Sequence, residues 1–311
     1  MNEKMIKRDL FGFLPHKWTF EFDGGKISPI PEFDEVAASV NKDTNEDGFL
    51  YPPIEYRVRV DPITINPLEK IPKTERPAHL HRIPPSHELC LSASSTPEKI
   101  RKGPGSFIIQ LLAYLFGVRL QFYDWWVDSR LPIKERVRTH GIRFTEKTAE
   151  EFLSHCYKTW KGWSEEECKR INNVLFMHSK APSYEWDWER FMIEYMVLDG
   201  CWKLAELLGS ISRRNVPHKD RIKTLCQIFE IPSNDDLTDK IVCLRNELFH
   251  ETLWDGSQPG TAVSNSSSNL PSHLRCLNQR LIMALFHYKT PYIQTGWWFF
   301  GNYSLDQPSE K

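Results

Sequence analysis

The strongest constraint on the fold is a helical periodicity of apolar residues in the second half of the chain. Between positions 188 and 205 these residues are spaced alternately three and four apart: Trp188, Phe191, Tyr195, Leu198, Trp202 and Ala205. Residues three and four apart lie on one face of an α-helix, so this spacing predicts a helix that packs on a core. The stretches 152–160, 222–229 and 274–285 show similar spacing, and together they predict a helical bundle.

Local capping signals predict where two of these helices begin. Thr145 can accept a hydrogen bond from the first turn of the helix that follows it. Ser164, with Glu167 three residues later, matches a capping box, in which each side chain accepts a hydrogen bond from the backbone of the other residue. The chain from residue 145 onward is therefore predicted to be mainly helical.

The first 104 residues differ in composition from the rest. They contain more than half of the 21 prolines. The stretches 18–22 and 54–65 alternate apolar and polar residues, which is typical of strands. We therefore predict an α+β fold in three parts: a β-rich N-terminal module at 1–104, a helical connecting region at 105–180 and a helical domain at 181–311. We expect the N-terminal module to be a sensor or specificity element.

Charge and cysteine usage exclude several classes of protein. The net charge is -1 and the pI about 6.8, so the chain lacks the global basic field of a nucleic-acid coat protein. Seven cysteines without paired spacing indicate a reducing compartment. The longest apolar run, 107–118, is shorter than the roughly 20 residues of a membrane span. We therefore predict a cytoplasmic protein that does not bind a membrane.

The segment 238–255 carries the most informative motif. Its helix is predicted from apolar residues spaced four, three and four apart: Leu237, Ile241, Leu244 and Leu248. Ser233 and Asp236 are the expected N-cap and near-capping box. Arg245, Asn246 and His250 form an R-N-x-x-x-H pattern on this helix. Asn246 and His250, four apart, should share a face, whereas Arg245 should lie roughly 140° away from His250.

This pattern resembles the signature of HEPN domains (higher eukaryotes and prokaryotes nucleotide-binding), and most closely that of the Apea-like HEPN group of phage defence. The resemblance covers roughly residues 185–295 and includes the helix-rich segment before the motif and the loop and apolar helix after it. It implies a HEPN-type bundle and a metal-independent endoribonuclease without a cofactor, acting in anti-phage defence or as a toxin. It also implies a homodimer whose two copies share one groove, with a phage component or an antitoxin as regulator.

The chemistry of these residue types fits RNA cleavage. The 2′-hydroxyl of RNA can attack the adjacent phosphorus, so the protein needs only to move protons and stabilise charge. An imidazole suits the first task, with a reference pKa of about 6.5. A guanidinium suits the second, because it binds phosphate bidentately. We therefore expect His250 and Arg245 to be catalytic, with Asn246 orienting the imidazole or binding a phosphate oxygen.

Two other interpretations of the motif remain open. His250 can simply be a cation at a helix C-terminus, with Arg245 pairing with Glu247 or Asp239 on the surface. Alternatively, the chain is a non-catalytic HEPN module that binds RNA, a nucleotide or a partner protein. Loss of RNA cleavage in variants of the motif would separate the enzyme from the module.

A dense basic stretch lies between residues 130 and 143. Such a run is usually a solvated surface. Beside a nuclease groove it could instead bind the RNA phosphates. On that hypothesis the RNA-binding residues are Arg130, Lys134, Arg136 and Arg138.

The segment HLHRIPPSHELC contains four possible metal ligands, namely His79, His81, His87 and Cys90. Their spacing does not match a standard zinc site, and no second Cys or His pair follows at the required distance. We therefore predict no metal, and interpret the segment as a proline-rich connector. A metal-dependent enzyme that uses His79, His81 and His87 is the remaining alternative, which metal analysis would decide.

Overall fold

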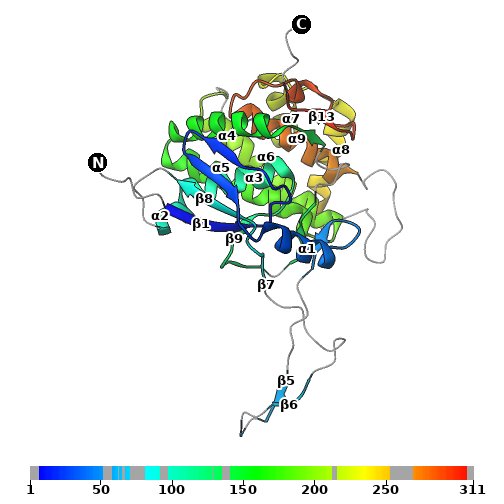
Figure 1. Cartoon of the computed structure of the whole chain (residues 1–311). Helices are drawn as coiled ribbons and strands as arrows, with labels where there is room; N and C mark the ends of the chain where they lie inside the picture. The colour runs from blue at the N-terminus through cyan, green and yellow to red at the C-terminus, as the bar shows by residue number, and fades with distance from the viewer. Residues whose placement is uncertain are drawn as a thin grey trace, which may run out of the picture.

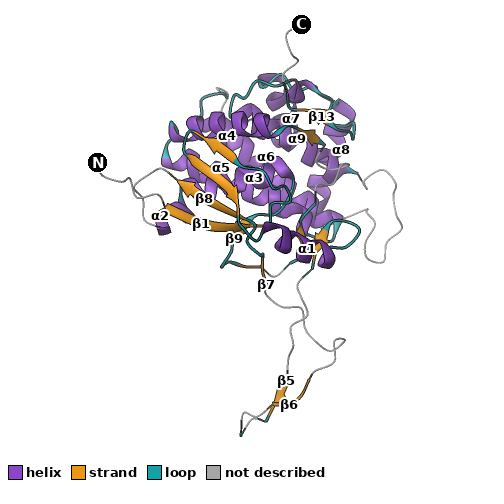
Figure 2. Cartoon of the chain, in the orientation of Figure 1, coloured by secondary structure: helices purple, strands orange, loops and turns teal. Residues whose placement is uncertain are grey.

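The computed structural model describes residues 7–51, 58–61, 63–64, 67–70, 81–91, 97–127, 129–134, 141–211, 216–252 and 269–306. Within these ranges the chain has an antiparallel sheet and a set of long helices, so the α+β prediction is confirmed (Figure 1). The labelled strands β1, β8 and β9 of the main sheet lie on one side of the molecule, whereas β13 lies among the helices α7, α8 and α9 (Figure 2).

The main sheet has five strands in the order β2-β3-β8-β1-β9, and every neighbouring pair is antiparallel. Their bounds are Lys7–Gly12 for β1, Phe20–Phe22 for β2, Gly25–Pro29 for β3, His87–Leu91 for β8 and Gln121–Phe122 for β9. Strand β2 confirms part of the strand predicted at 18–22. Its edge is covered, because Glu146 and Glu150 accept hydrogen bonds from the backbone N–H groups of Thr19 (3.0 Å) and Glu21 (2.8 Å).

The remaining strands form two-stranded sheets. The pairs are β4 (Phe49–Leu50) with β11 (Leu131–Pro132), β5 (Val58–Val60) with β6 (Pro67–Lys70), β7 (His81–Arg82) with β10 (Trp126–Val127), and β12 (Ile142–Arg143) with β13 (Tyr303–Ser304). Strand β5 lies inside the strand predicted at 54–65. The first 104 residues also contain helices α1 (Phe33–Asp43) and α2 (Pro97–Lys102), neither of which was predicted from the sequence.

Seven further α-helices follow in the described part of the chain. They are α3 (Pro104–Phe116), α4 (Glu146–Lys161), α5 (Glu165–Lys180), α6 (Asp187–Leu207), α7 (His218–Ile228), α8 (Asp235–Asn246) and α9 (Leu270–Leu285). The capping signals predicted at Thr145 and Ser164 are confirmed: the Thr145 side chain caps α4, and Ser164 and Glu167 form a capping box on α5. The apolar run at 107–118 lies mostly in α3. None of the described helices has both the length and the apolar character needed to cross a bilayer.

One core cluster joins the sheet to the helices. It contains Phe20 and Leu89 from the sheet, Leu112 from α3, Leu198 from α6 and Trp297 from the C-terminal segment. A smaller cluster lies under α1 and the short strands. The large cluster therefore includes residues from all three predicted parts of the chain, and the boundaries between those parts stay a prediction.

A buried polar network ties together α5, α6 and α9. Glu194 accepts hydrogen bonds from Arg275 Nη1 (2.7 Å) and Asn278 Nδ2 (2.8 Å), and it faces Nδ1 of His178 at 3.0 Å. All four side chains are buried. Because a buried charge is stable only when paired and hydrogen-bonded, this network fixes how α6 packs against its neighbours. Helix α6 in turn positions the candidate site.

Candidate functional site

Helix α8 carries the motif and is held by its apolar face. Ile241 and Leu244 are buried in the core cluster, as the spacing predicted. The expected cap at Ser233 is wrong: Oδ1 of Asn234 accepts the hydrogen bond from the Leu237 backbone N–H (3.0 Å). Asn234 is the residue directly before the helix, and asparagine is as good an N-cap as serine.

The helix predicted over 238–255 ends earlier than expected. Helix α8 ends at Asn246, and residues Glu247–Glu251 form a single π-helical turn. The turn ends at Thr252, whose φ of 57° is left-handed and whose backbone N–H donates to the Glu247 carbonyl. Residues 253–255 lie outside the described ranges.

The π-turn brings Arg245 to His250. In an α-helix these residues, five apart, would point in different directions, whereas i→i+5 hydrogen bonding places them above one another. Nη1 of Arg245 lies 2.8 Å from Nε2 of His250. The same Nη1 donates to Oδ1 of Asn246 at 3.1 Å. Asn246 and His250 therefore both contact one nitrogen of Arg245, at the centre of the cluster.

The contact selects one tautomer of the neutral imidazole. A guanidinium carries only donors, so Nε2 of His250 must accept, and the ring proton is on Nδ1. Asn246 and His250 are exposed, and Arg245 is partly exposed. A phosphate that approaches this surface can therefore reach all three side chains.

Aromatic rings support the Arg245 guanidinium. It lies 5.8 Å from the ring centre of Tyr195 on α6 and 5.4 Å from that of Phe249. Such cation–π contacts contribute about 0.5–1 kcal/mol at partly exposed sites. Burial raises the pKa of Tyr195 to about 12, so its phenol stays protonated. The uncharged Tyr195 ring thus packs against the Arg245 guanidinium of the motif.

A second polar group contacts the Tyr195 ring as well. His218, the first residue of α7, stacks on Tyr195 with ring centres 6.4 Å apart. Its Nδ1 lies 3.7 Å from Oδ1 of Asp199, and Arg221 Nη1 donates to that same oxygen at 2.7 Å. No sequence spacing links positions 199, 218 and 245, because only the packing of α6, α7 and α8 brings them together.

The electrostatics of His218 reflect these neighbours. Partial burial lowers the pKa of His218 below its ordinary value. The carboxylate of Asp199 opposes that shift of the His218 pKa, and the positive charge of Arg221 adds to it. The positive charge of Arg245 lowers the pKa of His218 further. His218 therefore lies within electrostatic range of the Arg245 guanidinium.

Of the four predicted RNA-binding residues, Arg130 lies apart from the motif and two are outside the described ranges. Arg130 is mostly buried; it donates to the Tyr184 carbonyl at 2.7 Å and lies over the ring of Phe49 at 4.3 Å. Tyr184 precedes the start of α6. Residue 187, at that start, is about 12 Å along the helix axis from Tyr195, the residue that packs on Arg245. Lys134 is exposed. Arg136 and Arg138 are outside the described residues.

The possible metal ligands do not converge where they are described. His87 and Cys90 alternate across β8, so His87 is buried and Cys90 is half-buried on the other face. The backbone of His81 lies in β7, and His79 is outside the described residues. The described part of the chain contains no group of three or more His, Cys, Asp or Glu side chains arranged to hold a metal ion.

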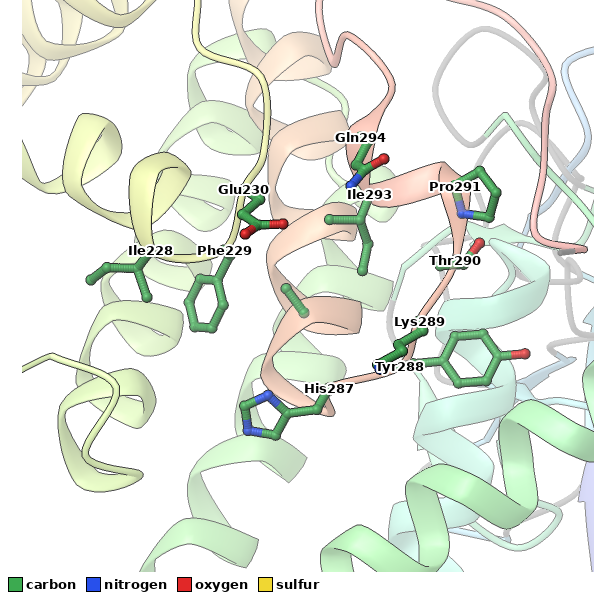
Figure 3. Close-up of a pocket in the computed structure, with 11 residues that line it drawn as sticks. Ile228, Phe229, Glu230, His287, Tyr288, Lys289, Thr290, Pro291, Ile293 and Gln294 are labelled. Atoms are coloured by element: carbon green, nitrogen blue, oxygen red, sulfur yellow. The ribbon is translucent and has the colours of Figure 1, made fainter. Parts of the chain in front are cut away.

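A hollow of about 590 Å³ lies at the opposite end of α7 from His218 (Figure 3). Phe229 and Glu230 line it on one side, and Ile293 and Gln294 on the other. A smaller hollow of about 360 Å³ lies between α5 and α6, with Lys169 and Met196 in its lining. Neither lining includes a residue of the R-N-x-x-x-H motif.

Comparisons with known protein families, with curated proteins and with solved structures found no match.

Proposed function

We propose that this chain is a metal-independent endoribonuclease of the HEPN type. The observation that carries the proposal is the 2.8 Å contact between Arg245 and His250, with Asn246 on the same guanidinium. A guanidinium and an imidazole on one exposed turn are the two groups that cleavage by the RNA 2′-hydroxyl requires. The sequence motif and the local geometry thus point to the same reaction.

In the proposed reaction, each motif residue has a defined role. Arg245 binds the non-bridging oxygens of the scissile phosphate and stabilises the charge that develops on them. The phosphate draws the guanidinium away from the imidazole, so Nε2 of His250 becomes free to accept the proton of the 2′-hydroxyl. Asn246 supports the guanidinium or binds a phosphate oxygen. The products are a 2′,3′-cyclic phosphate and a 5′-hydroxyl.

The surrounding architecture is proposed to be a HEPN-type bundle of α6, α7, α8 and α9. A second copy of the chain would bring another Arg245–His250 pair into a shared groove, as HEPN homodimers do. Lys134 keeps its proposed role as a phosphate contact because it is exposed. We propose action on RNA in the cytoplasm, in anti-phage defence or as a toxin, under the control of a phage component or an antitoxin.

The test is cleavage of total RNA in the presence of EDTA, with the ends mapped. Wild-type protein should leave 2′,3′-cyclic phosphates. Arg245→Ala and His250→Ala should each lower the cleavage rate by about 10²–10³-fold, because each removes one of the two groups that assist the transition state. Lys240→Ala, an exposed change on the same helix, is the matched control and should leave the rate unchanged.

Two results would contradict the proposal. Equal cleavage by wild type and by both motif variants would mean that another site, or a contaminant, cuts the RNA. Binding of RNA without cleavage under every activating condition would instead support the non-catalytic module.

A further inference from the structure

The Asp199–His218 pair resembles an acid–base unit more than a surface ion pair. Nδ1 of His218 faces Oδ1 of Asp199 at 3.7 Å, and this nitrogen is shielded from solvent. Arg221 holds the carboxylate in place through its 2.7 Å hydrogen bond. The imidazole as a whole remains 37% exposed. Its Nε2 is therefore the nitrogen that can meet a ligand.

The pair lies beside the motif because both pack on one ring. The ring centre of Tyr195 lies 6.4 Å from the ring centre of His218 and 6.3 Å from that of Phe249. The guanidinium carbon of Arg245 lies 5.8 Å from the same ring centre of Tyr195. Phe249 precedes His250 within the π-turn. Two imidazoles with different partners thus flank one guanidinium in a single chain.

We propose that His218 is the second catalytic acid–base residue of this site and that Asp199 is its positioning residue. This assignment rests on the proposed ribonuclease function. Cleavage moves two protons. His250 takes the proton of the 2′-hydroxyl while the O2′–P bond forms. His218, as imidazolium, gives its Nε2 proton to O5′ while the P–O5′ bond breaks. Exchange of both protons with water restores the starting state.

The partners of the two histidines assign the roles. His250 accepts a hydrogen bond from Arg245, so its Nε2 lacks a proton and suits a base. His218 faces a carboxylate, which favours its charged form. A phosphate bound to Arg245 would offset part of the positive charge that lowers the pKa of His218. Substrate binding therefore favours the protonated acid.

The experiment compares RNA with a natural 5′-oxygen leaving group and RNA with a 5′-bridging sulfur. A thiolate leaves without protonation, so the sulfur substrate needs no general acid. His218→Gln should slow cleavage of the natural substrate by about 10²–10⁴-fold. It should cleave the sulfur substrate at close to the wild-type rate. His250→Gln should be slow on both substrates, because the base is still required.

Asp199→Asn gives a readout that a purely structural role would not change. Asp199 raises the pKa of His218, so its neutralisation should shift the alkaline limb of the rate profile to lower pH. Lys219→Ala, an exposed change next to His218, is the matched control and should alter neither the rate nor the profile. Activity of His218→Gln on the sulfur substrate also shows that the variant is folded.

The outcomes separate this assignment from the proposed function. If wild type cleaves RNA and His218→Gln matches it on the natural substrate, His218 is not the acid, whereas the nuclease function stands. The same conclusion follows if the sulfur substrate fails to restore activity to a variant with a wild-type circular dichroism spectrum. If wild type cleaves neither substrate, both proposals are wrong.

Discussion

Tyr195 is the residue on which the candidate site depends. Its ring carries the Arg245 guanidinium and the His218 imidazole, yet its hydroxyl is buried and has no hydrogen-bond partner among the described residues. A buried hydroxyl without a partner lowers stability by about 1–3 kcal/mol. The ring therefore supports the site, and the hydroxyl contributes nothing that the described contacts reveal.

This difference predicts opposite results for two substitutions. Tyr195→Phe keeps the ring, so cleavage should stay within about twofold of wild type and the free energy of unfolding should be equal or up to about 1 kcal/mol higher. Tyr195→Ala removes the ring, so the free energy of unfolding should fall by about 3–5 kcal/mol. Cleavage should fall with it. Urea denaturation and RNA cleavage measure the two effects.

The informative failure would be a Tyr195→Phe variant that is as stable as wild type but inactive. That result would show that the phenol takes part in the chemistry, since the ring would still be present.

At the scale of elements, the features that could be predicted from the sequence are those that depend on contacts between neighbouring residues. Thr145 and Ser164 cap their own helices, so their signals could be read from a few neighbouring residues. The apolar faces of α6 and α9 could also be predicted, because their apolar residues are spaced three and four apart in the sequence. Helix α1 was missed because only Phe33 and Val40 are buried in it, which is too weak a pattern to distinguish a helix from a loop.

The geometry of the site could not be predicted in the same way. Arg245, Asn246 and His250 were identified as candidates, but the π-turn that joins Arg245 to His250 has no sequence signature comparable to a capping box. Asp199 and His218 lie on two further helices. Their proximity depends on how α6, α7 and α8 pack, and one sequence does not reveal that packing.

The buried network of α5, α6 and α9 gives a prediction about that packing. Burial opposes the ionisation of Glu194, but His178 and Arg275 outweigh it and hold the pKa of Glu194 below its ordinary value. Glu194→Gln would leave the Arg275 charge buried without its counter-ion. The free energy of unfolding should therefore fall by about 3–5 kcal/mol, measured by urea denaturation.

Glu206→Gln is the matched control, because it makes the same change on the same helix at a partly exposed position. Its ion pair with Lys203 is near the surface, so the free energy of unfolding should change by no more than about 1 kcal/mol. Equal effects of the two substitutions would mean that the network does not stabilise the packing of α6.

At the scale of the whole molecule, the continuous core links the sheet to the helices, so protonation in either part affects global unfolding. His87 is buried in β8 between the rings of Phe11 and Phe33, and burial lowers its pKa to about 4. Burial, and then the charge of Arg275, lowers the pKa of His178 in α5. The pKa of each histidine is therefore lower in the folded chain than in the unfolded chain, so both take up a proton more readily when the chain unfolds.

Acid should therefore destabilise the fold before its carboxylates titrate. A folded pKa of about 4 for His87, against about 6.5 in the unfolded chain, gives stability that is fully present above pH 6.5 and is lost as the pH falls to 4. The loss should be about 3 kcal/mol. His87→Gln should reduce the loss of unfolding free energy between pH 6.5 and 4 by that amount, as measured by urea denaturation at a series of pH values.

Ser86→Ala is the control. It removes the 2.9 Å contact to Nδ1 of His87 but keeps the imidazole, so its profile of unfolding free energy against pH should stay as steep as that of wild type. An equally steep profile in His87→Gln would show that other groups, His178 among them, cause the acid sensitivity.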